Sequence, residues 1–372
     1  MDIIKPLIGG LLFAGTIIGA GILGLPFALA QGGFLLGSLL LLLAGFFAYL
    51  SAVQIGVLVY DQQEQLPLHS IIERYLGWRM SYLSLAAILF STYGALIAYP
   101  LAIGEMVSTL FHLPAWLGAI VFITFITGFL SLNLKESNKI DATITLLLTM
   151  LLLWIVLRSL PQVRLDNLLA FHPSRIFSSF GVIIFAFAGH LVIPSVIYYM
   201  GVKRETGIKV LGWSIFAVGL LYLLFFTVST GVMGSEINRV ATLGLGKHLS
   251  PILAIAGQLF TVLAIITSFF GLAISLRMTL ARQFKLKPYH SLSLILVPVL
   301  LIDLLLSANP GNAFVKVLNY AGGIGSALYI GFIPAMIMAD KRFEFNIFLG
   351  RSGARLSLIF YGLAILYTVF FT

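Results

Sequence analysis

Two short segments of this chain combine residue types that interrupt a helix. Residues 15–26 hold four glycines and end on a proline, and residues 185–195 hold a glycine and a proline among small and apolar side chains. Glycine lowers helix stability and proline removes a backbone donor, so each segment predicts a broken helix. In each segment a glycine precedes the proline by five residues. These pairs are Gly21 with Pro26 and Gly189 with Pro194.

Where a helix is broken, backbone N–H and C=O groups lack their helical hydrogen-bond partners and can bind a ligand. Free N–H groups at the start of a half-helix attract an anion such as a carboxylate, and freed carbonyls attract a cation such as an ammonium group or Na⁺. Neither segment contains Asp, Glu, Lys or Arg. The pattern favours a site that holds a small zwitterion without charged side chains. The alternative is that these glycines only let helices pack closely, as small residues often do in membranes.

The composition places these segments in a membrane. Of the 372 residues, 60% are hydrophobic and 9% are charged, and the mean hydropathy is +1.07. A water-soluble fold has too little interior for this much apolar surface. The apolar runs are continuous rather than alternating, which excludes a β-barrel. The chain has no cysteine, which excludes a disulfide scaffold and a cysteine-ligated metal site.

The hydropathy predicts an all-α integral membrane protein with eleven transmembrane helices. Several predicted spans exceed the ~20 residues that a straight span needs, so tilted or broken helices are expected. Residues 66–73 predict a short amphipathic helix between the second and third spans. The predicted spans are 5–32, 34–60, 80–111, 115–133, 139–158, 175–201, 208–233, 251–284, 290–307, 312–339 and 354–371.

The distribution of basic residues predicts a cytoplasmic N-terminus and an external C-terminus. Sixteen of the 22 lysines and arginines then fall on the cytoplasmic side, in keeping with the positive-inside rule. The net charge of +9 forms no basic stripe, so it does not indicate a nucleic-acid partner. The first apolar run is too long for a cleaved signal peptide. We expect a multi-pass protein of the cytoplasmic membrane surrounded by lipid, and protein partners are unknown from the sequence.

The two breaks occupy corresponding places in two halves of the chain. When the sequence is shifted by the number of residues between the two breaks, each of the first five spans coincides with one of the next five. Because each half has an odd number of spans, the two halves have opposite orientations in the membrane. An inverted repeat with a breaker in the first helix of each half indicates a secondary transporter. We therefore predict a first repeat at 1–158, a second at 175–339, and an additional helix at 354–372.

Four segments resemble the hydroxy and aromatic amino acid permeases, within the wider amino acid/auxin permease group. The resemblance runs nearly from end to end, and it implies an eleven-helix LeuT-like fold with discontinuous helices 1 and 6 and ion-coupled uptake of amino acids. The segments are residues 15–26, Phe187-Ala188-Gly189-His190 with Ile193-Pro194-Ser195, Thr267-Ser268-Phe269-Phe270-Gly271, and Asn319-Tyr320-Ala321-Gly322.

The resemblance also assigns roles at the two breaks. The substrate carboxylate would meet the backbone around Gly21, and the ammonium group would meet freed carbonyls. Phe187 and His190 would border the side-chain pocket, with Tyr93 opposite; the alternative for the phenylalanines is plain packing. The substrate-binding residues expected on this basis are Thr16, Ile17, Gly19, Ala20, Gly21, Ile22, Tyr93, Phe185, Ala186, Phe187 and His190.

The sequence is compatible with either of two coupling ions, Na⁺ or H⁺. In sodium-coupled relatives of this fold, hydroxyls of the eighth span and carbonyls of the first make a sodium site. Here Thr267 and Ser268 with Thr16 and Gly19 would form it, unless the hydroxyls only bond their own helices. The closer relatives use protons, and His190 is the best-placed group to carry one. The alternative is a neutral His190 bonded to freed backbone.

The expected function is import of neutral, aromatic amino acids by H⁺ symport with alternating access. A cationic substrate would need a buried carboxylate, which the breaks lack. The alternatives are a Na⁺-coupled neutral amino acid symporter and an uncoupled facilitator or channel for zwitterions. No metal-spaced histidine pair, nucleophile elbow or phosphate loop indicates an enzyme, and no cofactor is expected apart from the coupling ion.

Overall fold

The computed structural model is helical throughout the residues that it describes, with no strand among them. In this part of the chain, nine helices are long and apolar enough to cross a membrane, and the bent pair Ile4–Ile17 and Gly21–Ala30 would be a tenth span. α6 (Ala115–Ser131) is apolar but shorter, and with it the helices match the eleven predicted spans. The described ranges are 4–131, 138–284, 286–307, 312–343 and 349–372.

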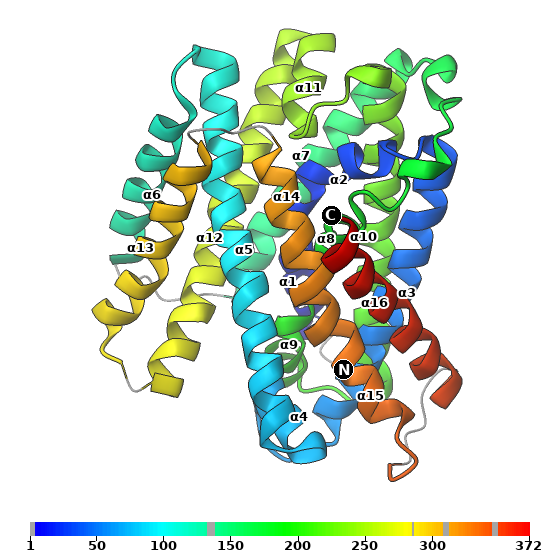
Figure 1. The fold of residues 1–372 in the computed structure, drawn as a ribbon, viewed down its shortest axis with the longest axis vertical. Helices are drawn as coiled ribbons and strands as arrows, with labels where there is room; N and C mark the ends of the chain where they lie inside the picture. The colour runs from blue at the N-terminus through cyan, green and yellow to red at the C-terminus, as the bar shows by residue number, and fades with distance from the viewer. Residues whose placement is uncertain (1–3, 132–137, 285, 308–311, 344–348) are drawn as a thin grey trace.

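The broken helices stand between two groups of longer helices (Figure 1). In that view α5, α6, α12 and α13 form one side, α3 and α16 form the other, and α1, α8 and α14 lie between them. The unbroken spans are α3 (Phe34–Tyr60), α5 (Trp78–Phe111), α7 (Asn138–Ser159), α10 (Arg204–Met233), α12 (Pro251–Phe284), α13 (Pro288–Ser307) and α16 (Gly350–Phe371). The short elements at the upper end are η1 (Leu160–Gln162), η2 (Leu165–Leu168), η3 (Pro173–Arg175), η5 (Gly234–Glu236) and α11 (Ala241–His248).

The first span is broken as its glycines predict. α1 (Ile4–Ile17) and α2 (Ala20–Ala30) are separated at Ile18 and Gly19, and the bend between them is 57°. The backbone of Gly19 is extended, with φ −118° and ψ −151°. Pro26 lies within α2 rather than at the break. The glycines, not the proline, therefore set the position of this interruption.

The sixth span is broken in a second way. α8 (Phe180–Ala186) ends before Phe187, and the single turn η4 (His190–Val192) leads into α9 (Ile193–Met200). Phe187 and Gly189 have ψ values of 5° and 3°, in the sparsely allowed region between helix and strand. Pro194 lies in the first turn of α9, where a missing N–H leaves no intrahelical bond unmade.

The tenth span contains a π-helical stretch beside the second break. α14 (Ala313–Tyr320), η6 (Ala321–Phe332) and α15 (Ile333–Ala339) are continuous, and η6 has 12 residues, long for a rare helix type. A Cβ on Gly322 would lie 2.6 Å from the Cβ of Phe185, and one on Gly331 would overlap the Tyr361 ring. Glycine thus lets η6 press directly against α8 and α16.

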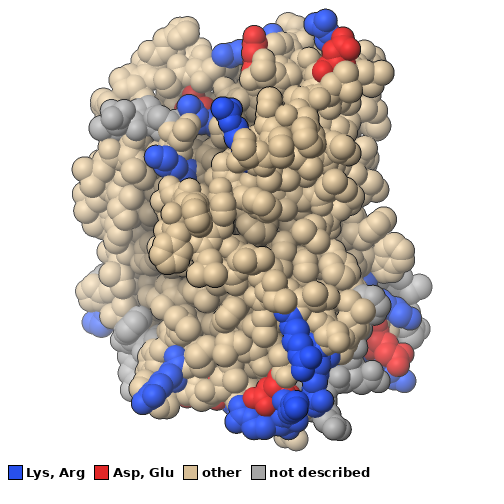
Figure 2. Space-filling model, turned by 45° about the vertical axis from the view of Figure 1, so that its right-hand side comes forward, with Lys and Arg blue, Asp and Glu red and all other residues tan. Residues whose placement is uncertain are grey.

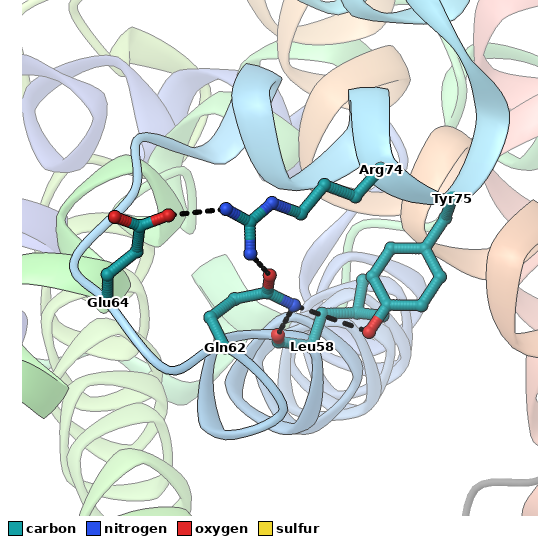
Figure 3. A network of polar contacts seen from close by, with 5 residues as sticks. All are labelled: Leu58, Gln62, Glu64, Arg74 and Tyr75. Carbon is teal, nitrogen blue, oxygen red and sulfur yellow. Dashed lines mark hydrogen bonds and ion pairs between the residues drawn. The ribbon is translucent and has the colours of Figure 1, made fainter.

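The predicted amphipathic helix is α4 (Leu68–Leu76), at the lower end of the molecule. Its buried face is Leu68, Ile71 and Ile72. Figure 3 shows how its polar face is tied to the end of α3: Arg74 pairs with Glu64 and donates to Gln62 Oε1 at 3.0 Å.

Tyr75 adds a second tie between α4 and α3. Gln62 Nε2 donates to the Leu58 carbonyl at 2.9 Å and to the Tyr75 hydroxyl at 3.3 Å, and that hydroxyl donates to Asp61. Burial, and then the bond to Asp61, raise the pKa of the Tyr75 phenol, so it remains a donor at physiological pH. α4 is therefore fixed across this end of the bundle.

Charged side chains gather at the two ends of the molecule. On the face shown in Figure 2, Lys, Arg, Asp and Glu lie near the top and bottom, and a broad band between them carries almost none. A charge in the hydrocarbon core of a bilayer is costly, so this band is where lipid would surround the protein. The breaks in α1/α2 and α8/α9 lie inside that band rather than at its edges.

Candidate substrate and ion site

The two breaks are in direct contact. A Cβ added to Gly21 would lie 2.6 Å from the Cα of Ala186, and one added to Gly189 would overlap the Ile17 side chain. Gly21 therefore meets the end of α8, and Gly189 meets the end of α1. Because these contacts involve backbone, the two interruptions predicted from separate parts of the sequence form one structural unit.

Tyr222 of α10 joins the two breaks. Its hydroxyl lies 2.8 Å from the Ile17 carbonyl oxygen and 2.9 Å from that of Ala186, and its one proton is shared between these acceptors. The side chain is fully buried, and its ring centroid is 5.4 Å from that of Phe187. Two carbonyls expected to meet an ammonium group thus converge within reach of a single donor. No sequence pattern pointed to Tyr222, because it lies in an unbroken helix.

The opposite side of the first break faces α5 and α12. A Cβ on Gly19 would lie 3.2 Å from Ser268 Oγ and 3.4 Å from the Tyr99 hydroxyl. Tyr99 is buried, and its ring centroid is 6.0 Å from that of Phe269. Gly19 is therefore flanked by two hydroxyls from separate helices. Sequence reasoning identified Ser268 but missed Tyr99.

Tyr93 lies elsewhere on the same helix. Its hydroxyl donates to the Leu294 carbonyl of α13 at 3.0 Å. Tyr93 and Tyr99 are both aromatic and both on α5, so composition does not distinguish them. Their six-residue separation is not a whole number of helical turns, and the tertiary fold directs Tyr99 rather than Tyr93 toward Gly19.

The four residues expected to hold Na⁺ are only partly brought together. Ser268 lies beside Gly19, as expected. Thr16 Oγ1 donates to the Leu12 carbonyl at 2.9 Å. Thr267 Oγ1 donates to its own helix, at 2.9 Å from Leu263 O and 3.2 Å from Ala264 O. Thr267 therefore makes the local bonds that were the alternative interpretation for the hydroxyls of the eighth span. Thr16 was expected to contribute its carbonyl, and the bond made by its hydroxyl does not test that role.

The phenylalanines of the second break differ in surroundings. Phe187 is 1% exposed, and its ring tip would lie 3.4 Å from a Cβ on Gly45 of α3. This is close packing between α3 and α10. Phe185 is half-buried and lies against Gly322 of η6, so part of its side chain stays accessible. Of the two, Phe185 is the better candidate to border a substrate.

The remaining predicted residues lie at the start of α2 and at η4. Ala20 begins α2, and Ile22 donates its N–H to the Gly19 carbonyl at 3.3 Å. His190 has no exposed surface; its Nε2 lies 2.9 Å from Ser51 Oγ and 3.0 Å from the Ala48 carbonyl oxygen, both on α3. Its ring meets Phe13 of α1 edge-on, with centroids 6.1 Å apart. The imidazole therefore lies between α1 and α3.

The site offers binding groups rather than a reacting constellation. Among the described residues, no cluster of three or more His, Cys, Asp or Glu side chains could hold a metal ion. Carbonyls, an N-terminal helix turn and hydroxyls surround the point where the breaks meet. Such groups bind both ends of a zwitterion and hard cations, without making or breaking covalent bonds.

Two touching discontinuous helices within a bundle of apolar spans define the class of protein: a polytopic membrane transporter with a LeuT-like fold. The family model described as the tryptophan/tyrosine permease family matches residues 4–351. The chain belongs to this family, and it is a transporter rather than an enzyme.

Individual relatives cover almost the whole chain. Tyrosine-specific transport system 1 of Haemophilus influenzae is 29% identical over 379 residues, covering 94% of this chain and 92% of the relative. Glutamine transporter 2 of Aliivibrio fischeri is 24% identical over 353 residues, covering 90% and 89%. The crystal structure of MhsT in complex with L-phenylalanine superposes with a TM-score of 0.68 at 15% identity, covering 98% and 97%. The last similarity is one of fold alone.

Proposed function

We propose that this protein is a secondary active transporter that imports neutral, aromatic amino acids by H⁺ symport with alternating access. The observation that carries the proposal is the convergence of the Ile17 and Ala186 carbonyls on Tyr222, next to the close contact of Gly21 with Ala186. These peptide groups come from both broken helices. A ligand held there would be sensitive to any movement of one half of the protein against the other.

The two charges of an amino acid match the two kinds of group at the breaks. The carboxylate would lie at the N-terminal turn of α2, where the N–H groups of Ala20 and Gly21 and the helix dipole favour an anion. The ammonium group would use the remaining lone pair of the Ala186 carbonyl, because the Ile17 carbonyl accepts the Gly19 N–H at 2.9 Å as well as the Tyr222 hydroxyl. Neither break carries a charged side chain that could neutralise a third charge, so a neutral amino acid is the substrate.

An aromatic side chain fits what borders the breaks. Phe185 is partly accessible on α8, and the Tyr99 hydroxyl lies beside Gly19. Aromatic rings pair favourably with such neighbours. The relatives of this chain include one named for tyrosine and one named for glutamine, and we infer that these bordering side chains decide the choice of substrate.

A proton is the favoured coupling ion. Na⁺ prefers several oxygen ligands, and of the expected residues Gly19 and Ser268 lie side by side, whereas the Thr267 hydroxyl donates within its own helix. His190 is an ionisable group buried at the second break, where such residues are rare and usually functional. A proton bound at His190 would place a positive charge at the second break, to which Ala186 also belongs.

The two repeats and the orientation complete the proposal. We infer that residues 1–158 and 175–339 are inverted repeats, since each begins with a span broken near its middle. α16 lies outside them. The lower end in Figure 1, which carries α4, would face the cytoplasm. Rocking of the helices around the two breaks would then expose the site to each side in turn.

Uptake by purified protein in proteoliposomes tests the proposal. Tyrosine, tryptophan, phenylalanine and glutamine are offered under an imposed pH gradient, under an imposed Na⁺ gradient, and under neither. Accumulation above equilibrium with the pH gradient alone is the expected result. Accumulation only with Na⁺ would establish the sodium-coupled alternative, and equilibration without accumulation would establish a facilitator. A thermal-shift screen with the twenty amino acids identifies the substrate independently of coupling.

A further inference from the structure

A buried chain of hydroxyls links His190 to the eleventh span. Ser51 of α3 lies 2.9 Å from His190 Nε2 and 3.3 Å from the Tyr361 hydroxyl of α16. The three side chains are at most 1% exposed. α16 lies outside the predicted repeats, and nothing in the proposed substrate site requires it. Its hydroxyl nevertheless ends a hydrogen-bonded path that begins at the second break.

The geometry at Nε2 fixes which imidazole nitrogen carries the proton in the neutral ring. The Ala48 carbonyl oxygen, 3.0 Å from Nε2, can only accept a hydrogen bond. An unprotonated Nε2 would place its lone pair against that oxygen. Nε2 therefore bears the hydrogen, and it donates to Ala48 and to Ser51 Oγ. Ser51 also lies 3.0 Å from the Ala48 carbonyl, so its own proton is directed there, and Tyr361 donates to Ser51.

The other nitrogen is left to bind a proton. Nδ1 is buried and has no hydrogen-bond partner in the described part of the chain. It is the only remaining basic atom of the ring, and the imidazole interacts with the backbone of Phe187, within the break. A proton added at Nδ1 creates an N–H donor where a lone pair stood, on a residue that directly follows the Phe187–Gly189 break. Occupancy of this one atom would therefore alter the break that contributes Ala186.

We propose that Ser51 and Tyr361 are positioning residues that hold His190 as the Nε2–H tautomer, so that the transported proton binds and leaves at Nδ1. The inference rests on the proposed proton coupling. An N–H bond forms when a hydronium ion of the outer solution gives its proton to the Nδ1 lone pair, which leaves water and makes the ring a cation. The same N–H bond breaks when the proton passes to water of the inner solution, which restores the neutral ring.

The surroundings suit a charge that is held briefly. α1 presents Phe13 to the ring, α3 presents Ala48 and Ser51, and α16 presents Tyr361 behind Ser51. Tyr361 is the one titratable side chain among these contacts, and none of them is a carboxylate. Dipoles alone stabilise the cation, whereas an ion pair would retain it.

Removal of the hydroxyls, with His190 left in place, tests this inference. Initial rates of uptake by proteoliposomes are measured from pH 5 to 8 for the wild type, Ser51→Ala and Tyr361→Phe. The bonds to Ser51 strengthen when the ring is charged, so Ser51→Ala should move the midpoint of the pH profile toward acid by about 0.7 unit, from a bond worth about 1 kcal/mol. Tyr361→Phe should move it in the same direction by less.

Ser357→Ala is the matched control. Ser357 lies on α16 and accepts a hydrogen bond from Gln54 of α3 at 3.4 Å, so its loss removes a buried hydroxyl between the same two helices without touching His190. Its pH profile should match that of the wild type. In a His190→Ala background, Ser51→Ala should have no further effect on the profile.

The outcomes separate this inference from the proposed function. A pH-dependent wild type whose midpoint is unchanged in Ser51→Ala and Tyr361→Phe overturns the positioning role, even if those variants are less stable. A wild type without uptake driven by the pH gradient overturns the proton coupling itself. If Ser51→Ala does not fold, Tyr361→Phe keeps all of the Nε2 contacts and still decides the question through its midpoint.

Discussion

The Cα of Ala186 would lie only 2.6 Å from a Cβ placed on Gly21, closer than real Cβ atoms approach another residue's backbone. This contact joins the start of α2 to the end of α8, two points more than 160 residues apart in the chain. Glycine is required at position 21 because a side chain there would collide with Ala186, and not because of the backbone conformation at that position. The contact also brings the backbone of Gly21 against the residue whose carbonyl accepts the Tyr222 hydroxyl.

Gly21→Val, and even Gly21→Ala, should abolish high-affinity substrate binding. The added carbon meets backbone that cannot rotate away, so the two breaks must separate, and a displacement of about 1 Å at such a site costs about 100-fold. Ligand-induced thermal stabilisation of the purified variants measures the loss. Gly128→Ala is the control, because nothing lies within 4 Å of a Cβ there. Wild-type affinity in Gly21→Val would refute the site.

Tyr222→Phe should weaken substrate binding by roughly 3- to 10-fold, the value of one hydrogen bond. The ring stays in place, so the variant should retain its packing against Phe187, while the Ile17 and Ala186 carbonyls lose their shared donor. Equilibrium binding of labelled substrate gives the ratio. Tyr60→Phe serves as the comparison, since the Tyr60 hydroxyl is buried without a partner in the described residues. Equal affinities in the two variants would show that Tyr222 has no part in the site.

His190→Ala should flatten the pH dependence of uptake between pH 5 and 8 while leaving substrate binding measurable. The ring contacts α1 and α3 and not the Ile17 and Ala186 carbonyls, so its loss removes the proton site more than the substrate site. Uptake in proteoliposomes and thermal shift with substrate separate the two effects. An unchanged pH profile would remove His190 from coupling.

Replacement of both Thr267 and Ser268 by alanine should leave uptake within about 3-fold of the wild type if protons drive it, since only hydrogen bonds of ordinary strength are lost. The single variants sharpen the test, because Ser268 lies beside Gly19 whereas Thr267 bonds Leu263 and Ala264. A Na⁺-stimulated rate in the wild type that disappears in Ser268→Ala, but not in Thr267→Ala, would instead assign the coupling ion as Na⁺.

The breaks were predictable because their cause is local. Glycine and proline act on the backbone within a few residues, so both interruptions could be identified from their own segments. The contacts of Tyr93 and Tyr99 were not predictable in the same way. Both are tyrosines of α5, and the direction each one faces depends on how α5 packs against α12 and α13. Thr267 differs from them, because its bonds to the Leu263 and Ala264 carbonyls are local and were the stated alternative.

The sequence by itself determined that this chain spans a membrane about eleven times and that its first and sixth spans are broken, because apolar length and backbone chemistry are properties of short stretches. Only the tertiary structure decided what the breaks touch. The hydroxyl of Tyr222 joins the Ile17 and Ala186 carbonyls, and Ser51 connects His190 to Tyr361. These contacts join helices far apart in the chain, and their partners are selected by packing, which no local pattern encodes.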